Sequence, residues 1–549
     1  MQKRIKSFDR NNLIVLLEIA FTLAFFAPIE IFFSNSKEIW MDIYDFLPMC
    51  SIVFVALAVI LLAVFLMVTT FNAKWGEVFC SIAFSVNTIL YVLGNFVPAR
   101  ASMMDDGTSI NWCDINNNMI DVLIISFVTL VLILLFWKSG NKRLKVFCTI
   151  SVCLFLLQIY TLGVASFISP GNGWEKREQP ELTEKNLFTY STESNFTILV
   201  LDQFDARMFT YYLEKGNEHI DALDGFTYYP DTVCKYNFTD CAVPHMVSGN
   251  EFKHQTDFTT YLEGAYSNSP FIKELSNAQY DVNVYTYDVP GNAVKDIYDN
   301  CVVVDMGISS HRKLIMYIYR LVGCKYLPFW FKQFCWFPSD DLDDLKDIEG
   351  VDDTCDEFEL QPVNYANTNF YNKLNLMNST NKRMFHFIHL RGIHGPWSHD
   401  EYMHETDQSG EYLVAEGVLY LVDEWLDDLR QIDAYDNNVI IIMGDHGSMM
   451  ETDEDDRSQN PLFLVKGFDE HHALEISKNR VSYDQLQEIY KRLLEGETAS
   501  KAVEDYNKDR KFFKCEKYKY AEGELREYCV DGFAWEINRI HETGNVYTP

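Results

Sequence analysis

The sequence predicts a two-part protein: five membrane-spanning helices, then an α/β domain with a mostly parallel sheet covered by helices. Three observations predict this fold class. Five long apolar runs fill the first third of the 549-residue chain, and short β-rich runs alternate with amphipathic stretches in the rest. The formal net charge of −33 belongs entirely to the second part, because residues 1–169 hold 11 basic and 11 acidic groups. So acidic a chain is not expected to bind nucleic acid.

The apolar runs are each about the ~20 residues that a helix needs to cross the hydrocarbon core of a bilayer. They lie at 12–33, 49–71, 77–98, 119–137 and 146–168. Glu18 and Glu30 fall inside the first run, where a carboxylate is a functional candidate because its burial in lipid is costly. The alternative for Glu30, near the outer interface, is contact with lipid headgroups.

The orientation follows from the basic residues of the short loops. The N-terminus and the second and fourth loops hold nine Lys and Arg residues, whereas the first and third loops hold only Lys37 and Arg100. This contrast predicts a cytoplasmic N-terminus. Five crossings then place everything beyond about residue 170 outside. We expect a transmembrane domain over 1–168, a juxtamembrane linker over 169–195 and an extracytoplasmic domain over 196–549.

The second part shows strand and helix patterns in alternation. The β-rich runs are Phe196–Leu201, Val282–Tyr287, Cys301–Val304, Met384–Leu390, Val439–Met443 and Leu462–Val465. The stretch Tyr412–Leu429 repeats its apolar residues at helical spacing. Nearly continuous apolar strands that alternate with helices predict a mostly parallel sheet. In such a sheet the ligand site lies beyond the carboxyl ends of the strands.

Three of these runs lead into carboxylates and imidazoles. Asp202 follows the first, Asp445 and His446 follow the fifth, and His389, Arg391 and His394 lie at the end of the fourth or just after it. A lone Asp after a strand usually caps a helix. Three strand ends with Asp and His side chains instead indicate a site for a divalent ion such as Zn²⁺ or Mn²⁺.

Thr239 supplies a hydroxyl where a loop turns into a short helix. Coordination to a dication lowers the pKa of such a hydroxyl and makes it a nucleophile. The alternative is that Thr239 only caps the helix. Cys234 and Cys241 flank it, and the sequence is compatible both with a disulfide and with two small buried side chains.

These segments resemble the membrane-anchored transferase branch of the alkaline phosphatase/sulfatase superfamily, which includes lipoteichoic acid synthase and the lipid A phosphoethanolamine transferases. Asp202 matches the acidic metal ligand after the first strand, and Thr239 stands five residues before Pro244, as the family's nucleophile does. Asp445-His446-Gly447 matches the metal-binding pair, and His389 through Pro396 matches a His-x-x-Gly-x-His-Gly-Pro stretch.

The resemblance implies one divalent ion, Mn or Zn, held by Asp202, Asp445, His446 and Thr239. It places His394 as the histidine that moves a proton or binds phosphate. His389, Arg391 and Lys235 are the candidate substrate-binding residues; Arg391 and Lys235 are equally plausible as surface charges. Two features depart from the family: Asp replaces the usual Glu at 202, and the acidic stretch 449–456 lacks a histidine typical of the phosphoethanolamine transferases.

The implied function is transfer of a phosphoglycerol or phosphoethanolamine headgroup from a membrane phospholipid to a surface glycan or glycolipid, through a phospho-threonine. The alternatives are a phosphodiesterase, phosphatase or sulfatase-like hydrolase, and an inactive protein that senses lipid or glycan. Cys241-Ala-Val-Pro-His245 does not fit the formylglycine motif of sulfatases. The expected location is the cell membrane, with a bacterial source favoured.

Overall fold

The computed structural model describes residues 10–36, 39–97, 110, 112–168, 178–338, 340–348, 360–406, 408–448, 460–504, 512–517 and 523–549. The chain divides into two compact units. The membrane unit comprises Met1–Glu178 and Asp305–Glu349, and the α/β unit comprises Gln179–Val304 and Gly350–Pro549. Residues 305–349, expected above within the second domain, thus group with the membrane helices. Residues 169–177 of the expected linker and the acidic stretch 449–456 lie outside the described residues.

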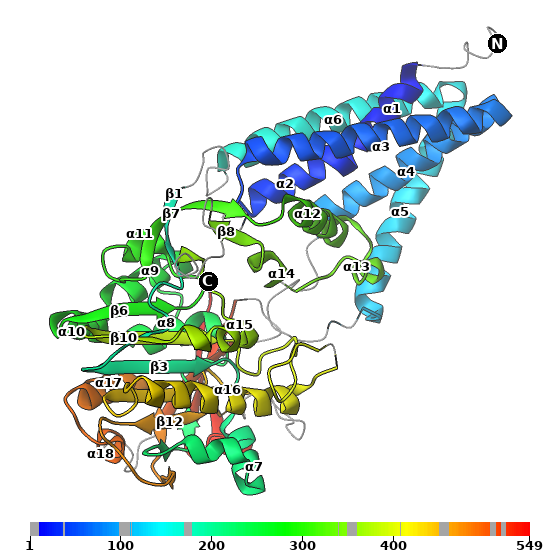
Figure 1. Cartoon of the computed structure of the whole chain (residues 1–549). Helices are drawn as coiled ribbons and strands as arrows, with labels where there is room; N and C mark the ends of the chain where they lie inside the picture. Colours follow the sequence, from blue (N-terminus) through cyan, green and yellow to red (C-terminus); the bar gives the residue numbers. More distant parts are fainter. Residues whose placement is uncertain are drawn as a thin grey trace. The chain divides into compact units, whose positions relative to one another are not determined.

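The membrane unit contains, within its described residues, five helical segments that are long and apolar enough to cross a membrane, as expected. They are α1–α2 (Arg10–Phe21 and Ala27–Ser34, joined by a π-helical turn Thr22–Phe26), α3 (Ile43–Phe71), α4 (Ala73–Phe96), α5 (Ile115–Ser139) and α6 (Arg143–Ile168) (Figure 1). The first segment is the innermost, because 67% of its most apolar window is buried against 6% for α3. The same unit holds α12 (His311–Tyr326), α13 (Phe329–Lys332), α14 (Asp340–Asp343) and β8 (Lys346–Ile348).

The α/β unit is built on a seven-stranded sheet in the order β13-β4-β12-β11-β3-β10-β6. The strands are β3 (Asn195–Leu201), β4 (Thr227–Tyr228), β6 (Tyr280–Tyr285), β10 (Arg383–Leu390), β11 (Asn438–Met443), β12 (Phe463–Lys466) and β13 (Glu475–Ile476). The β10–β3, β10–β6, β11–β3 and β13–β4 pairs are parallel, and the β11–β12 and β12–β4 pairs are antiparallel. The expectation of a mostly parallel sheet is confirmed.

Helices cover both faces of the sheet, which explains the nearly continuous apolar strands. Every residue of β3 is buried, and alternate side chains face opposite layers. Leu199 and Leu201 pack with α7 (Ala206–Lys215) and α16 (Glu411–Gln431), the helix expected over Tyr412–Leu429. Phe196, Ile198 and Val200 pack with the helices of the other layer, α8 (Thr239–Ser248), α10 (Pro270–Asn277), α17 (Leu486–Leu494) and α18 (Ala499–Glu504).

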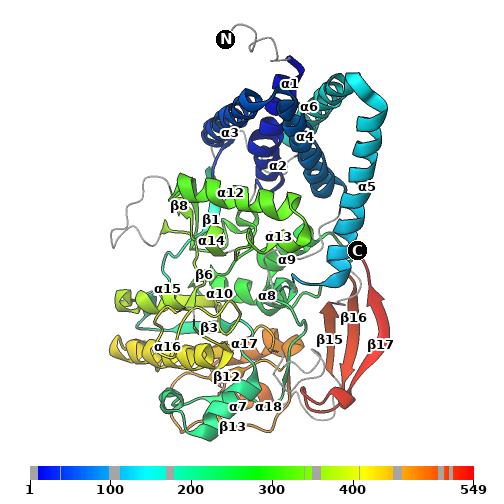
Figure 2. The ribbon, with the colours of Figure 1, turned by 90° about the vertical axis from the view of Figure 1, so that its right-hand side faces the viewer.

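Smaller elements surround this sheet. The expected strand Cys301–Val304 is the start of β7 (Cys301–Ile308), which pairs with β8 outside the main sheet. An antiparallel sheet of β15 (Phe512–Lys517), β16 (Leu525–Val530) and β17 (Ile540–Tyr547) ends the chain (Figure 2). The remaining short elements are β1 (Glu178–Leu182), β2 (Thr189–Ser191), β5 (Thr232–Val233), β9 (Asn378–Thr380), β14 (Val481–Ser482), α9 (Phe258–Asn268), α11 (Gly291–Val294) and α15 (Asn367–Asn372).

Candidate metal centre

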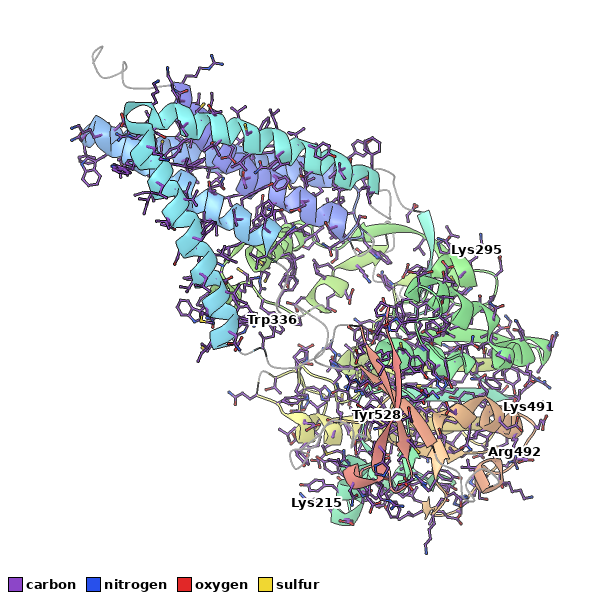
Figure 3. All side chains as sticks on the ribbon, turned by 180° about the vertical axis from the view of Figure 1, so that it is seen from behind. Lys215, Lys295, Trp336, Lys491, Arg492 and Tyr528 are labelled. Atoms are coloured by element: carbon purple, nitrogen blue, oxygen red, sulfur yellow. The ribbon has the colours of Figure 1, made fainter. Side chains whose placement is uncertain are left out.

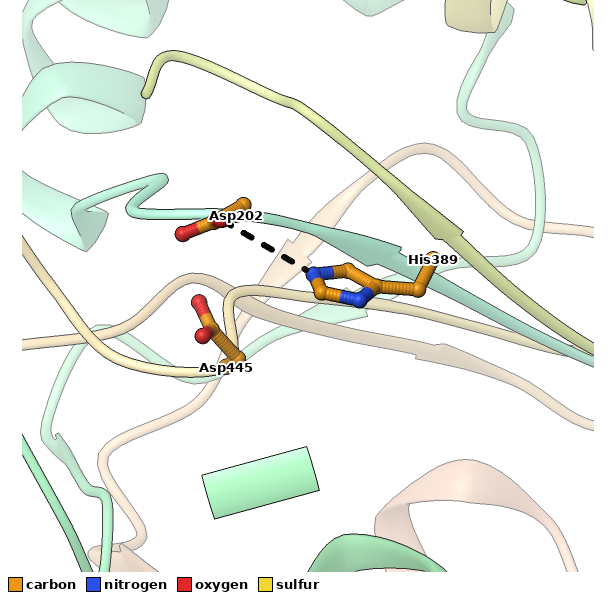
Figure 4. Close-up of side chains that lie close together, drawn as sticks. All are labelled: Asp202, His389 and Asp445. Atoms are coloured by element: carbon orange, nitrogen blue, oxygen red, sulfur yellow. Dashed lines mark ion pairs between the residues drawn. The ribbon is translucent and has the colours of Figure 1, made fainter. Parts of the chain in front are cut away.

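The carboxyl ends of three neighbouring strands bring two aspartates and a histidine together. The central strand β3 leads into Asp202, β11 leads to Asp445, and His389 is the penultimate residue of β10. One carboxylate oxygen of each aspartate and one ring nitrogen of His389 all lie within 4.8 Å of one another (Figure 4). This buried Asp-His-Asp group could hold a metal ion.

One polar atom of each side chain in this group is unsatisfied. Asp202 Oδ1, His389 Nε2 and Asp445 Oδ2 are buried, and none has a hydrogen-bond partner among the described residues. Buried polar atoms in proteins almost always have a partner. Oxygen and imidazole nitrogen acceptors that converge without donors fit a divalent cation such as Zn²⁺ or Mn²⁺.

Neighbouring groups fix which atoms point inward. The backbone amide of Gln203 donates to Asp445 Oδ1 at 3.0 Å, which leaves Oδ2 for the cluster. The hydroxyl of Thr286 lies 3.0 Å from His389 Nδ1, so Nε2 is the ring atom left for the group. His446 Nδ1 lies 2.9 Å from the Gly447 carbonyl, to which only an Nδ1–H can donate. Such contacts on the second ring nitrogen orient metal-binding histidines and set their tautomer.

His446 joins the same two aspartates from another side. Its Nε2 lies 3.8 Å from Asp202 Oδ1 and 3.5 Å from Asp445 Oδ2. Its Nε2 is also 3.4 Å from Thr239 Oγ1. The structure therefore brings together all four side chains that the sequence analysis assigned to the metal. It adds His389, which that analysis assigned to substrate.

The electrostatics of the group favour a bound cation. Burial and the adjacent Asp445 carboxylate raise the pKa of Asp202 well above its usual value, because two buried carboxylates repel each other. Burial lowers the pKa of His389 to about 4, so its imidazole is neutral at pH 7 and keeps a lone pair on one nitrogen. Arg391 lies near Asp202; burial lowers the pKa of its guanidinium to about 10, so that it remains cationic.

Thr239 is the first residue of α8, and its side chain does not cap the helix. The N-cap position is Phe238, with no side-chain cap hydrogen bond. The interpretation of Thr239 as a simple cap is therefore wrong. Its hydroxyl lies at a helix N-terminus, which favours an anion. It borders a small pocket, whose lining includes Val243, Pro244 and Tyr266.

Thr286 and Tyr287 are site residues that sequence reasoning missed. The Tyr287 ring stacks on His389 with ring centroids 5.4 Å apart. The side chain of Tyr287 also hydrogen-bonds with Thr239. Both residues follow directly after β6, which ends at Tyr285. The expected strand, Val282–Tyr287, began and ended two residues later than β6, and it therefore hid two residues that lie just past a strand end.

A tight turn after β10 carries Arg391 and His394. Gly392 has φ +57°, and a Cβ added there would lie 2.4 Å from the Asp202 carbonyl oxygen. The Ile393 amide donates to that carbonyl at 2.9 Å, so the turn is joined to the end of β3. His394 Nδ1 lies 2.6 Å from the Gly395 carbonyl, which leaves Nε2 to exchange protons. Burial lowers the pKa of His394.

Lys235 is held by carboxylates outside this group. Its ammonium lies 2.7 Å from Glu251 Oε1 and 3.0 Å from Asp484 Oδ1, and the side chain is only 4% exposed. Two carboxylates thus compensate its charge. Cys234 and Cys241, on either side of Thr239 in the sequence, are buried thiols.

No family model and no curated protein matches the sequence. Solved structures do. An alkaline phosphatase superfamily protein from Vibrio parahaemolyticus is 11% identical, with a TM-score of 0.36 over 67% of this chain and 81% of its own. The lipoteichoic acid synthase LtaP from Listeria monocytogenes is 14% identical, with a TM-score of 0.35 over 63% and 84%. The C-terminal periplasmic domain of EcEptC from Escherichia coli is 11% identical, with a TM-score of 0.35 over 63% and 96%.

At this level of similarity the reaction has to be argued from the residues of this chain. The solved structures to which the chain is similar thus include members of the alkaline phosphatase superfamily.

Proposed function

We propose that the chain is a metal-dependent phosphotransferase of the membrane-anchored branch of the alkaline phosphatase/sulfatase superfamily. It moves the phosphoryl headgroup of a membrane phospholipid, phosphoglycerol or phosphoethanolamine, to a surface glycan or glycolipid. The observation that carries the proposal is the convergence of unsatisfied acceptor atoms from Asp202, Asp445 and His389 beside the Thr239 hydroxyl, with His446 between them.

The residues fit one divalent ion, Mn or Zn. Asp202, Asp445 and His446 would hold it together with Thr239, and His389 offers a further nitrogen on the other side of the aspartates. Bound there, the ion would supply a positive charge that lowers the pKa of the Thr239 hydroxyl and stabilises phosphoryl oxygens.

Individual side chains carry out the nucleophilic attack, the proton transfers and the binding of phosphoryl oxygens. Thr239 Oγ1 attacks the phosphorus, the bond from phosphorus to the diacylglycerol oxygen breaks, and the headgroup stays on Thr239. The oxygen of an acceptor hydroxyl then attacks the same phosphorus and the bond to Thr239 breaks. His394 takes the proton that Thr239 loses and gives it to the diacylglycerol oxygen; in the second step it takes the proton that the acceptor loses and returns it to Thr239. The Arg391 guanidinium holds phosphoryl oxygens, while Lys235 and its two carboxylates position the loop before α8.

The membrane helices have a clear role in this scheme, because the donor lipid never leaves the bilayer. The excess of Lys and Arg in alternate loops supports a cytoplasmic N-terminus and an extracytoplasmic α/β unit in a bacterial cell membrane. A soluble donor would need no such anchor.

Peptide mass spectrometry tests the proposal. Purified full-length protein, loaded with Mn²⁺ or Zn²⁺, is incubated with mixed phospholipids and digested. We expect a phosphoglycerol or phosphoethanolamine mass increment on the peptide that contains Thr239. Thr239→Ala should abolish it, whereas Thr259→Ala, at an exposed position on α9, should not.

Two results would contradict the transferase. Free headgroup phosphate formed at the same rate with and without glycan acceptors would identify a hydrolase. The wild-type protein could gain no mass increment, and its cellular role could survive Thr239→Ala. These two results together would identify a binding or sensing protein.

A further inference from the structure

A basic, aromatic-rich segment lies in the chain between β7 and β8. Residues 309–339 contain five Lys and Arg residues and no Asp or Glu, in a chain whose net charge is −33. The segment is also rich in aromatic residues: Tyr317, Tyr319, Tyr326, Phe329, Trp330, Phe331, Phe334, Trp336 and Phe337. Basic and aromatic side chains together are typical of a membrane–water interface.

One face of α12 packs on the membrane helices. Leu314, Ile318 and Val322 are buried in a cluster that also contains Phe26 and Phe32 of the first span. Figures 1 and 2 both show α12 beside the ends of α2 and α4. The helix is therefore an integral part of the membrane unit.

Polar contacts fix the depth of α12 relative to the ends of the membrane spans. The Tyr326 hydroxyl donates to Glu30 Oε2 at 2.8 Å, and Lys325 pairs with Glu30 Oε1 at 2.8 Å. The Asn95 amide donates to the Tyr326 hydroxyl at 3.4 Å. Glu30 lies four residues before the end of α2, and Asn95 is the penultimate residue of α4. At 1.5 Å per residue, the end of α12 is within about 6 Å of where both spans end.

The next helix, α13, lies at the same boundary. The backbone amide of Phe329 donates to the carboxylate of Asp121, which is six residues, or about 9 Å, from the start of α5. Phe329 also packs on Trp112, just before α5, with ring centroids 5.4 Å apart. Because successive spans run in opposite directions, the ends of α2 and α4 and the start of α5 lie on one side of the membrane. Both α12 and α13 are therefore at the edge of the hydrocarbon on that side.

Several other side chains of this segment are exposed. Trp330, Phe331 and Phe334 are 47%, 45% and 70% exposed, although large apolar side chains at this level of a bilayer are normally covered by lipid. Arg312 and Lys313 are exposed at the start of α12, and the described part of the chain supplies no ion-pair partner for either. Trp336, which follows α13, is labelled in Figure 3.

We propose that α12 and α13 form an interfacial element that binds anionic phospholipid of the leaflet at this end of the spans. Trp330, Phe331 and Phe334 insert between the headgroups, and Arg312 and Lys313 contact lipid phosphates. The charge complementarity favours phospholipid as the partner of this surface, because the segment has a net positive charge in a strongly acidic protein. The inference does not depend on the reaction proposed above.

Lipid photocrosslinking tests the insertion. The full chain is reconstituted in nanodiscs of phosphatidylcholine and phosphatidylglycerol that contain a trace of phosphatidylcholine with a diazirine near its glycerol. We expect severalfold more crosslinking on peptides spanning Trp330–Phe334 than on the peptide with Phe533, a half-exposed aromatic residue of the α/β unit. Trp330→Ser with Phe334→Ser should remove the difference. Equal labelling of the two peptides would overturn the proposal, and so would protection of Trp330–Phe334 by a second copy of the chain or by another protein.

Lipid retention tests the charge preference. Native mass spectrometry counts the phosphatidylglycerol molecules that remain on protein purified from equal mixtures with phosphatidylcholine. Arg312→Gln with Lys313→Gln should lower the preference for phosphatidylglycerol by about fivefold for each cation removed. The control is Lys215→Gln with Lys295→Gln, at exposed lysines labelled in Figure 3, which should leave the preference unchanged. An unchanged preference in the Arg312 and Lys313 variant would overturn the assignment of these two residues, whatever the crosslinking shows.

Discussion

Two buried polar clusters, one in each unit, differ in how their carboxylates are satisfied. In the membrane unit, Glu18 Oε1 accepts hydrogen bonds from Thr22 at 2.9 Å and Asn87 at 3.3 Å, and Oε2 accepts one from Asn87 at 3.3 Å. In the α/β unit, Asp202 Oδ1 and Asp445 Oδ2 have no hydrogen-bond donor among the described residues. The two clusters are about equally buried, so burial does not distinguish them.

The difference separates a structural network from a binding site. A buried carboxylate that has donors on both oxygens needs no further partner. Two adjacent carboxylates whose inner oxygens have none are costly unless a cation lies between them. The proposed metal site is therefore at the strand ends, and for Glu18 we expect a structural role.

The largest expected effect is loss of the cation. Asp445→Asn removes half of the negative charge at the site while it preserves the size of the side chain. We expect headgroup transfer to fall on the order of 1,000-fold, because the positive charge at the phosphoryl group is lost. Bound Mn or Zn, measured by elemental analysis of the purified protein, should fall in parallel. Full metal content in a folded Asp445→Asn protein would contradict the assignment.

The next effect concerns His394 and pH. Burial lowers the pKa of this imidazole below its usual value near 6.5, so the neutral form that accepts a proton persists at lower pH. Transfer should therefore decline only at a pH below the usual pKa of an imidazole, where the ring becomes protonated. His394→Gln should lower the rate roughly 100-fold or more and remove this acid limb. An acid limb that remains in the variant would belong to another group.

A substitution in the turn after β10 tests how the strand ends are held together. Gly392→Ala places a methyl group 2.4 Å from the Asp202 carbonyl, whereas Gly216→Ala, also at positive φ, meets no atom within 4 Å. Both changes add backbone strain of about 1 kcal/mol. Only Gly392→Ala should displace Asp202 and lower transfer by about 100-fold. Thermal unfolding alongside the rate separates the two effects, and equal activity of both variants would refute the coupling.

A smaller effect is expected at a residue that never touches the metal. Thr286→Val removes the hydroxyl next to His389 Nδ1 and leaves the ring free to rotate. Loss of such a partner typically costs about 10–100-fold in metal affinity or activity. Thr286→Ser keeps the hydroxyl and should restore metal affinity, as measured by titration. Identical affinity in all three proteins would show that His389 does not bind the ion.

The contrast also shows what a single sequence reveals. Asp202, Asp445 and His446 were predictable because each follows a strongly apolar strand, and parallel strands end at one edge of a sheet. Thr286 and Tyr287 were not, because strand boundaries are uncertain by a few residues and their chemistry is ordinary for a strand. The pairing of Lys235 with Glu251 and Asp484 depends on long-range packing that no local pattern encodes. The grouping of residues 305–349 with the membrane helices has the same cause.

The smallest expected effect is at Glu18. Glu18→Gln keeps a carbonyl that can accept from Thr22 and Asn87, and it adds an amide that can donate to Asn87 Oδ1, a buried atom with no partner among the described residues. Stability should therefore change by less than about 0.5 kcal/mol, whereas Glu18→Leu should cost about 1 kcal/mol. Unfolding in detergent micelles measures both. If Glu18→Gln instead abolished transfer or metal binding, the carboxylate would have a chemical role, and hydrogen-bond satisfaction would no longer distinguish the two clusters.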